Sequence, residues 1–109
     1  MKPLVTARDV FDACIVLLGG PDKLRMILSG RRHNETVRER ELIVGAVREI
    51  PWATPSFPEI ARLFNMASHS TSHTQYQRWL AFSESDRTAW LSIVSEQVAK
   101  TKGLLTQSV

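Results

Sequence analysis

The residues best suited to chemistry stand in one short run, Ser68 to His73, which contains four hydroxyl side chains and two imidazoles. Small polar side chains in the first turn of a helix can hydrogen-bond to base edges or phosphates, and the free N–H groups of that turn attract phosphate. A short helix and a turn precede the run, which is the organisation of a helix-turn-helix. An ordinary capped helix in a bundle fits this pattern equally well.

A second group of candidates is basic. The segment 30–34, Gly-Arg-Arg-His-Asn, has no apolar period and is predicted to be an exposed loop between two helices. The helix that follows carries Arg38, Arg40 and Arg48, all expected off its buried face. With a net charge of +3, these positions predict a surface that attracts a polyanion. The alternative is a solvated surface with ion pairs at helical spacing.

Periodicity predicts the elements that position these residues. The chain, residues 1–109, is expected to be one all-α domain, a compact bundle of about six helices. Capping signatures are predicted at Thr6 with Asp9, Thr36 with Glu39, Ser56 with Glu59, and Ser83 with Asp86. Glycine or proline is expected to end the first three helices, at Gly19, Gly30 and Pro51.

The later helices carry the remaining expectations. Asn65 with Met66 is predicted to form a tight turn, because asparagine tolerates the left-handed conformation. Inner faces are predicted for Tyr76, Trp79 and Leu80 in the fifth helix, and for Trp90, Ile93, Val94, Gln97 and Val98 in the last. That last helix is expected to span about 84–100, and the tail 103–109 to be frayed.

A family resemblance sharpens the helix-turn-helix prediction. The segment Ser56-Phe57-Pro58-Glu59-Ile60-Ala61-Arg62-Leu63-Phe64, followed by His69-Ser70-Thr71, resembles the signature S-L-P-E-I-G-x-x-F-G-G-R-D-H-T-T-V of the bacterial replication initiator DnaA. Leu28-Ser29-Gly30-Arg31-Arg32 through Arg38-Glu39-Arg40 is similar to the family's L-S-K-R-R through R-P-R. The similarity covers about residues 10–80 and implies the C-terminal DNA-binding domain, akin in fold to the Trp repressor.

The resemblance implies a role for each matching residue. Arg32 would enter the minor groove, and Arg40 and Arg48 of the following helix would meet the DNA backbone. Arg31 in the same segment and Arg38 in the same helix are further candidate contacts, because their positive charge attracts phosphate. In the major groove, the resemblance implies contacts from His69, Ser70 and Thr71, with a late basic contact from Arg78 and a phosphate near Pro58. Ser68 and His73 belong to the same polar run and are further candidate contacts. With about four to six phosphate contacts, log K should fall against log salt with a slope of roughly −4 to −5.

Several positions depart from the DnaA pattern at the residues with which that family recognises the DNA sequence. Ala67 and Ser68 replace the family's R-D, and Ser72 with His73 replaces V-L. Glu41 stands where the family often has glutamine, and a carboxylate facing the duplex would repel phosphate. We therefore expect sequence-specific or semi-specific duplex binding in replication initiation or its regulation, without preference for the usual DnaA box.

Other classes of function have weaker support from the sequence. His69 and His73 share a helical face and could bind zinc, but no further ligand is placed with them. The sequence contains no G-x-x-x-x-G-K-[ST] loop, nucleophile elbow or HEXXH motif, so we expect no nucleotide, no metal, no other cofactor and no enzyme activity. The strongest rival is a helical adaptor that kept the fold, lost DNA binding and uses Trp52 or Met66 for protein contact.

Composition predicts the compartment and the partners. Cys14, the single cysteine, has no disulfide partner, which fits a reducing cytoplasm. No apolar run approaches the roughly 20 residues that cross a bilayer, and the N-terminal residues lack the order of a signal peptide. We expect a cytoplasmic protein that binds double-stranded DNA, with a replication or regulatory protein as a second partner and no membrane partner.

Overall fold

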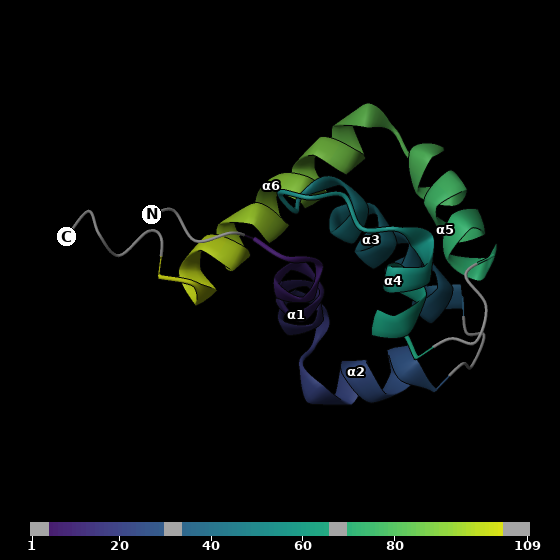
Figure 1. Cartoon of the computed structure of the whole chain (residues 1–109), viewed down its shortest axis with the longest axis horizontal. Helices are drawn as coiled ribbons and strands as arrows, with labels where there is room; N and C mark the ends of the chain where they lie inside the picture. The colour runs from purple at the N-terminus through teal and green to yellow at the C-terminus, as the bar shows by residue number, and fades with distance from the viewer. Residues whose placement is uncertain (1–4, 30–33, 66–69, 104–109) are drawn as a thin grey trace.

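The computed structural model of the chain describes residues 5–29, 34–65 and 70–103, and within these ranges the chain forms six α-helices and no strand (Figure 1). The helices are α1 (Ala7–Leu18), α2 (Pro21–Leu28), α3 (Asn34–Glu49), α4 (Phe57–Leu63), α5 (Ser70–Leu80) and α6 (Glu84–Thr101). The predicted all-α bundle is confirmed. In the described part of the chain, no helix has the length and apolar character that a membrane span requires.

Side-chain caps determine where three of these helices begin. At α1, the Asp9 N–H donates to Thr6 Oγ1 over 3.1 Å, and the Thr6 N–H donates to Asp9 Oδ2 over 2.9 Å. Ser56 and Glu59 form the same reciprocal pair at α4, and the Asp86 N–H donates to the hydroxyl of Ser83 at α6. Each pair satisfies backbone N–H groups that a first turn leaves without partners, so these three predicted helix starts are confirmed.

The cap predicted for α3 is wrong. The helix begins at Asn34, and Thr36 lies inside it with a buried hydroxyl that has no hydrogen-bond partner among the described residues. Glu39 instead accepts a hydrogen bond from Lys23 Nζ of α2 at 3.0 Å. Both side chains of that ion pair are largely buried, so a contact between two helices replaces the local capping motif.

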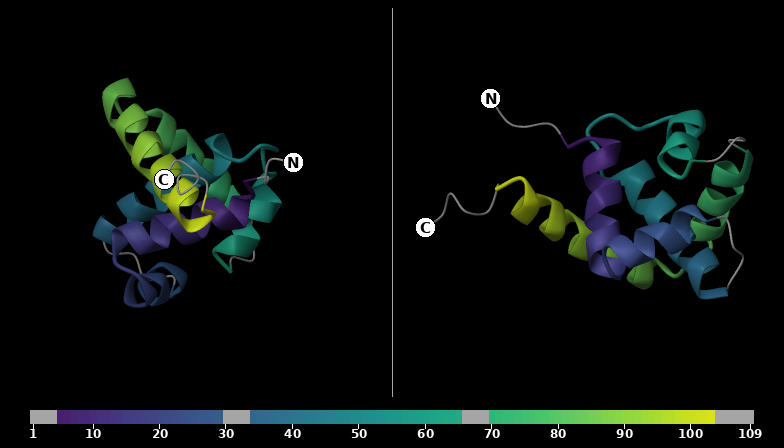
Figure 2. Two further views of the ribbon diagram at one scale, coloured as in Figure 1. Left: turned by 90° about the vertical axis from the view of Figure 1, so that its left-hand side faces the viewer. Right: turned by 90° about the horizontal axis from the view of Figure 1, so that it is seen from below.

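The hydrophobic core forms around α3, which contacts each of the other five helices (Figures 1 and 2). Its buried residues come from five helices and include Phe11, Cys14, Ile27, Ile43, Val47, Ile60, Phe64, Val94 and Val98. Burial raises the pKa of the Cys14 thiol, which keeps that side chain neutral as an ordinary core residue.

The inner-face positions predicted for Trp79 and Trp90 are confirmed. Trp79 has no exposed surface and its indole N–H donates to the Glu49 carboxylate, while half-buried Trp90 donates to the Leu42 carbonyl at 2.9 Å. Trp79 lies directly against Gly45 of α3, and a Cβ atom at position 45 would overlap the indole ring. The absence of a side chain at Gly45 is therefore what admits the tryptophan.

Two residues predicted on inner faces are instead exposed. Leu80 retains 41% and Ile93 49% of its exposable surface. In α5 the buried residues Ser72, Gln75 and Trp79 define the packed face, and Leu80 follows one residue beyond it. In α6 the packed row is Trp90, Val94 and Val98, and Ile93 lies on its flank.

Candidate nucleic-acid interface

The candidate interface is built on α4 and α5, two consecutive short helices that contact each other and α3. Pro58 lies exposed in the first turn of α4, and after that helix Asn65 adopts the left-handed conformation, with φ of 57°. The turn conformation predicted for Asn65 is therefore confirmed. With one face of α5 fixed against α3 and α4, the opposite face is left toward solvent at the edge of the bundle (Figure 1).

Three predicted contact residues of α5 have side chains that the structure describes. Thr71, His73 and Arg78 of α5 are all exposed. Thr71, Thr74 and Arg78 recur at helical spacing and share one exposed face of α5. The His73 ring lies edge-on to the ring of Phe57, with 5.0 Å between centroids, which fixes this side chain beside α4.

Several predicted contacts lie outside the described residues. These are Arg31 and Arg32 of the predicted basic loop, and Ser68 and His69, which precede α5 in the sequence. Met66, proposed for the adaptor alternative, lies outside them as well. Ser70 begins α5, and only its backbone is described.

A buried carboxylate lies between two of the predicted contact residues. Glu41 is only 8% exposed, and its charge interacts with Arg78 of α5 and with Arg38 one turn earlier in α3. Arg38 is exposed, and its guanidinium lies 5.1 Å from the centroid of the Phe82 ring. Burial raises the pKa of Glu41, although both arginines act in the opposite direction. Glu41 therefore partly neutralises the cations that a phosphate would meet.

This burial predicts how stability depends on pH. Because folding raises the pKa of Glu41 above its ordinary value, ionisation of this carboxylate lowers the stability of the folded protein as the pH rises through the folded pKa. We expect Glu41→Gln to have a higher Tm than the parent at pH 7, with the difference shrinking toward pH 4 in thermal melts by circular dichroism. Glu96→Gln removes an exposed carboxylate from α6 and should change Tm little at either pH. A lower Tm for Glu41→Gln at pH 7 would show that ionised Glu41 is net stabilising.

The prediction that Arg40 lies off the buried face of its helix is wrong. Arg40 is 5% exposed, and its guanidinium donates to the Ile27 carbonyl at 2.8 and 3.0 Å and to the Met26 carbonyl at 3.4 Å. These carbonyls belong to the last turn of α2, whose final C=O groups have no partner within the helix. Burial lowers the pKa of Arg40. The side chain caps α2 and does not extend toward solvent.

Arg48 also serves the scaffold. Its guanidinium donates to the Pro55 carbonyl and lies 4.3 Å from the centroid of the Phe57 ring and 5.5 Å from that of Tyr76. Cation–π contacts of this kind favour an arginine over an aromatic face. The cluster joins α3, the start of α4 and α5. No sequence spacing could have predicted it, because its members come from separate elements.

The described residues do not supply a set of ligands for the alternative zinc site. Among the residues described, no three histidine, cysteine, aspartate or glutamate side chains lie close enough together to hold a metal ion. His73 contacts Phe57, and the predicted second ligand, His69, lies outside those residues.

Comparison with protein families, with curated proteins and with solved structures finds no match for this chain. The resemblance to DnaA therefore rests on the motif residues alone. The geometry of α4 and α5 is independent of that resemblance.

Proposed function

We propose that this chain binds duplex DNA, with α4 and α5 acting as a helix-turn-helix and α5 presented to the major groove. The observation that carries the proposal is the exposed face of α5. Thr71 and Thr74 supply hydroxyls and Arg78 a guanidinium, and these groups are donors and acceptors of the kind used on base edges and phosphates.

The rigid mounting of α5 supports this proposal. Trp79 is buried against α3, Tyr76 contacts the Arg48 side chain of α3, and His73 contacts Phe57 at the start of α4. A recognition helix held from two sides loses little conformational entropy on binding.

Electrostatics support the same face. Arg38 on α3 and Arg78 on α5 both interact with Glu41, which places these two cations on neighbouring parts of one surface. The basic segment 30–33 precedes α3 in the sequence, and in this proposal Arg32 enters the minor groove beside the helix. Phosphate neutralisation by such cations supplies most of the affinity that does not depend on sequence.

The finer proposal follows from the DnaA-like motifs. The chain would act in replication initiation or its regulation, in the cytoplasm, together with a replication or regulatory protein that supplies any nucleotide-dependent step. It would have no enzyme activity of its own. Because Ala67 and Ser68 replace the family's arginine and aspartate, the usual DnaA box would not be preferred.

Arg78 offers a direct test of the proposed surface. We expect Arg78→Gln to weaken binding to a labelled duplex and to lower the steepness of log K against log salt by about 1, the effect of one lost phosphate contact. Lys100→Gln is the matched control, because Lys100 is an exposed cation near the C-terminal end of α6, away from α5 (Figure 1). Fluorescence anisotropy across a salt series measures both. Equal effects of the two variants would indicate binding by net charge without this surface.

A second candidate function is the helical adaptor, and one observation favours it. Trp52, in the segment between α3 and α4, is 82% exposed. Tryptophan is usually well buried in a monomer and is enriched where proteins bind one another.

A further inference from the structure

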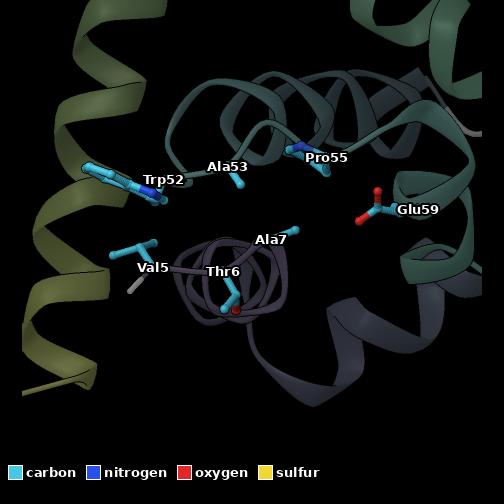
Figure 3. A pocket seen from close by; sticks show the side chains of 7 residues that line it. All are labelled: Val5, Thr6, Ala7, Trp52, Ala53, Pro55 and Glu59. Atoms are coloured by element: carbon cyan, nitrogen blue, oxygen red, sulfur yellow. The ribbon is translucent and has the colours of Figure 1, made fainter. Parts of the chain in front are cut away.

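A small pocket of about 210 Å³ opens between the N-terminus of α1 and the segment that joins α3 to α4 (Figure 3). Its lining residues are Val5, Thr6, Ala7, Trp52, Ala53, Pro55 and Glu59. None of them is among the predicted DNA contacts. The pocket is therefore a second candidate site, independent of the proposed function.

The walls of the pocket are held in place by hydrogen bonds. The backbone N–H of Trp52 donates to the backbone carbonyl of Val5 at 3.2 Å, which joins the two walls of the pocket directly. Thr6 and Glu59 each belong to a helix capping box, and the Pro55 carbonyl accepts from Arg48. A site fixed in this way needs little ordering when it is filled.

The lining combines apolar surface with a single charge. Val5, Ala7, Ala53 and Pro55 are apolar, and Glu59 is the one charged residue among the seven. Figure 3 shows the Glu59 carboxylate directed into the pocket, across from the Trp52 indole. Glu59 Oε1 accepts hydrogen bonds from the Ser56 N–H and hydroxyl, and no described group donates to Oε2. The ligand that complements this pocket therefore has an apolar stem that ends in a positive charge.

We propose that the pocket receives an arginine side chain from a partner protein. Its volume lies below the 300–1,000 Å³ or so of typical small-molecule sites, and it suits one side chain of a larger partner. Arginine fits better than lysine, because a planar guanidinium can pair with a carboxylate through two N–H groups. The methylene stem lies against Ala53 and Pro55, and the guanidinium meets Glu59. Trp52 is the anchor of the contact.

The test begins with a random peptide library displayed on phage and selected against the parent protein at physiological salt. We expect the selected peptides to share an arginine. Replacing that arginine with citrulline, which keeps the shape and removes the charge, should weaken binding about tenfold by calorimetry. Selection of peptides without arginine, or equal binding of the citrulline peptide, would overturn the proposal.

Protein variants locate the binding to the pocket. Trp52→Ala should abolish measurable peptide binding. Glu59→Gln should weaken binding of the arginine peptide and leave the affinity for the citrulline peptide unchanged. Glutamine can still complete the capping box, so this variant keeps α4 intact. Ile93→Ala removes another exposed apolar side chain, on α6, and should bind as the parent does. Equal losses in Ile93→Ala and Trp52→Ala would overturn the assignment to this pocket.

Two further experiments distinguish a partner's side chain from a small-molecule ligand, and this inference from the proposed DNA binding. Free argininamide should bind far more weakly than the peptide, and equal affinity would instead identify a small-molecule site. Trp52→Ala should bind duplex DNA as the parent does. Loss of DNA binding by every protein would refute the proposed function alone, and loss of peptide specificity would refute this inference alone.

Discussion

Gly45→Ala is expected to destabilise the protein by about 2 kcal/mol, although alanine in a helix interior is normally more stable than glycine by roughly 1 kcal/mol. The added Cβ would overlap Cγ, Cδ2 and Cε2 of Trp79, which is fully buried. The ring cannot yield easily, since its N–H is bonded to Glu49. In a chain of this size the loss should lower Tm by about 8 °C, measured by circular dichroism.

A double-mutant cycle provides the control for this prediction. Trp79→Leu is itself destabilising because it leaves a cavity, but it removes the ring that meets position 45. On that background, Gly45→Ala should cost much less or become stabilising, so the two changes should not be additive. A neutral or stabilising Gly45→Ala in the parent would contradict the close packing of Trp79 on α3.

Arg32→Ala is expected to give the largest single loss in DNA binding, about tenfold, because an arginine in a narrow minor groove meets a concentrated negative potential. The preference for A·T-rich duplex should fall with it. This expectation comes from the DnaA-like motif, since Arg32 lies outside the described residues. Competition binding with A·T-rich and G·C-rich duplexes measures the affinity and the preference together.

Two neighbouring arginines supply the controls for Arg32→Ala. Arg31→Ala removes the adjacent charge of the loop, and Arg25→Ala removes an exposed charge from α2. Both should cost less than Arg32→Ala and leave the A·T preference intact. Equal small losses in the three variants would make the loop a generic positive surface. Lys23 does not serve as such a control, because its ion pair with Glu39 is largely buried, whereas the ion pair between Arg25 and Asp22 is exposed.

Helix positions were predictable because they depend on local chemistry. The capping pairs at Thr6, Ser56 and Ser83, the proline at the start of α2 and the turn at Asn65 all act within a few residues. Where a prediction failed, contacts between helices were the cause. Glu39 pairs with α2 and leaves no capping box at Thr36.

The candidate site was predictable in part for the same reason. The exposed positions of Thr71, His73 and Arg78 follow from the helical period of α5. Charge pattern alone could not distinguish Arg38, which is exposed, from Arg40, which caps α2, or Arg48, which stacks on Phe57. Likewise, no spacing indicated that Gly45 accommodates Trp79 or that Trp52 and Glu59 line one pocket.

The salt dependence of duplex binding tests the central proposal most directly. With Arg40 and Arg48 engaged within the protein, about four cations remain for phosphate, namely Arg31, Arg32, Arg38 and Arg78. Fluorescence anisotropy with a labelled random-sequence duplex should therefore give binding at low salt and a slope of log K against log salt of about −3 to −4. The absence of binding at low salt, or an affinity independent of salt, would contradict the proposal that this chain binds DNA.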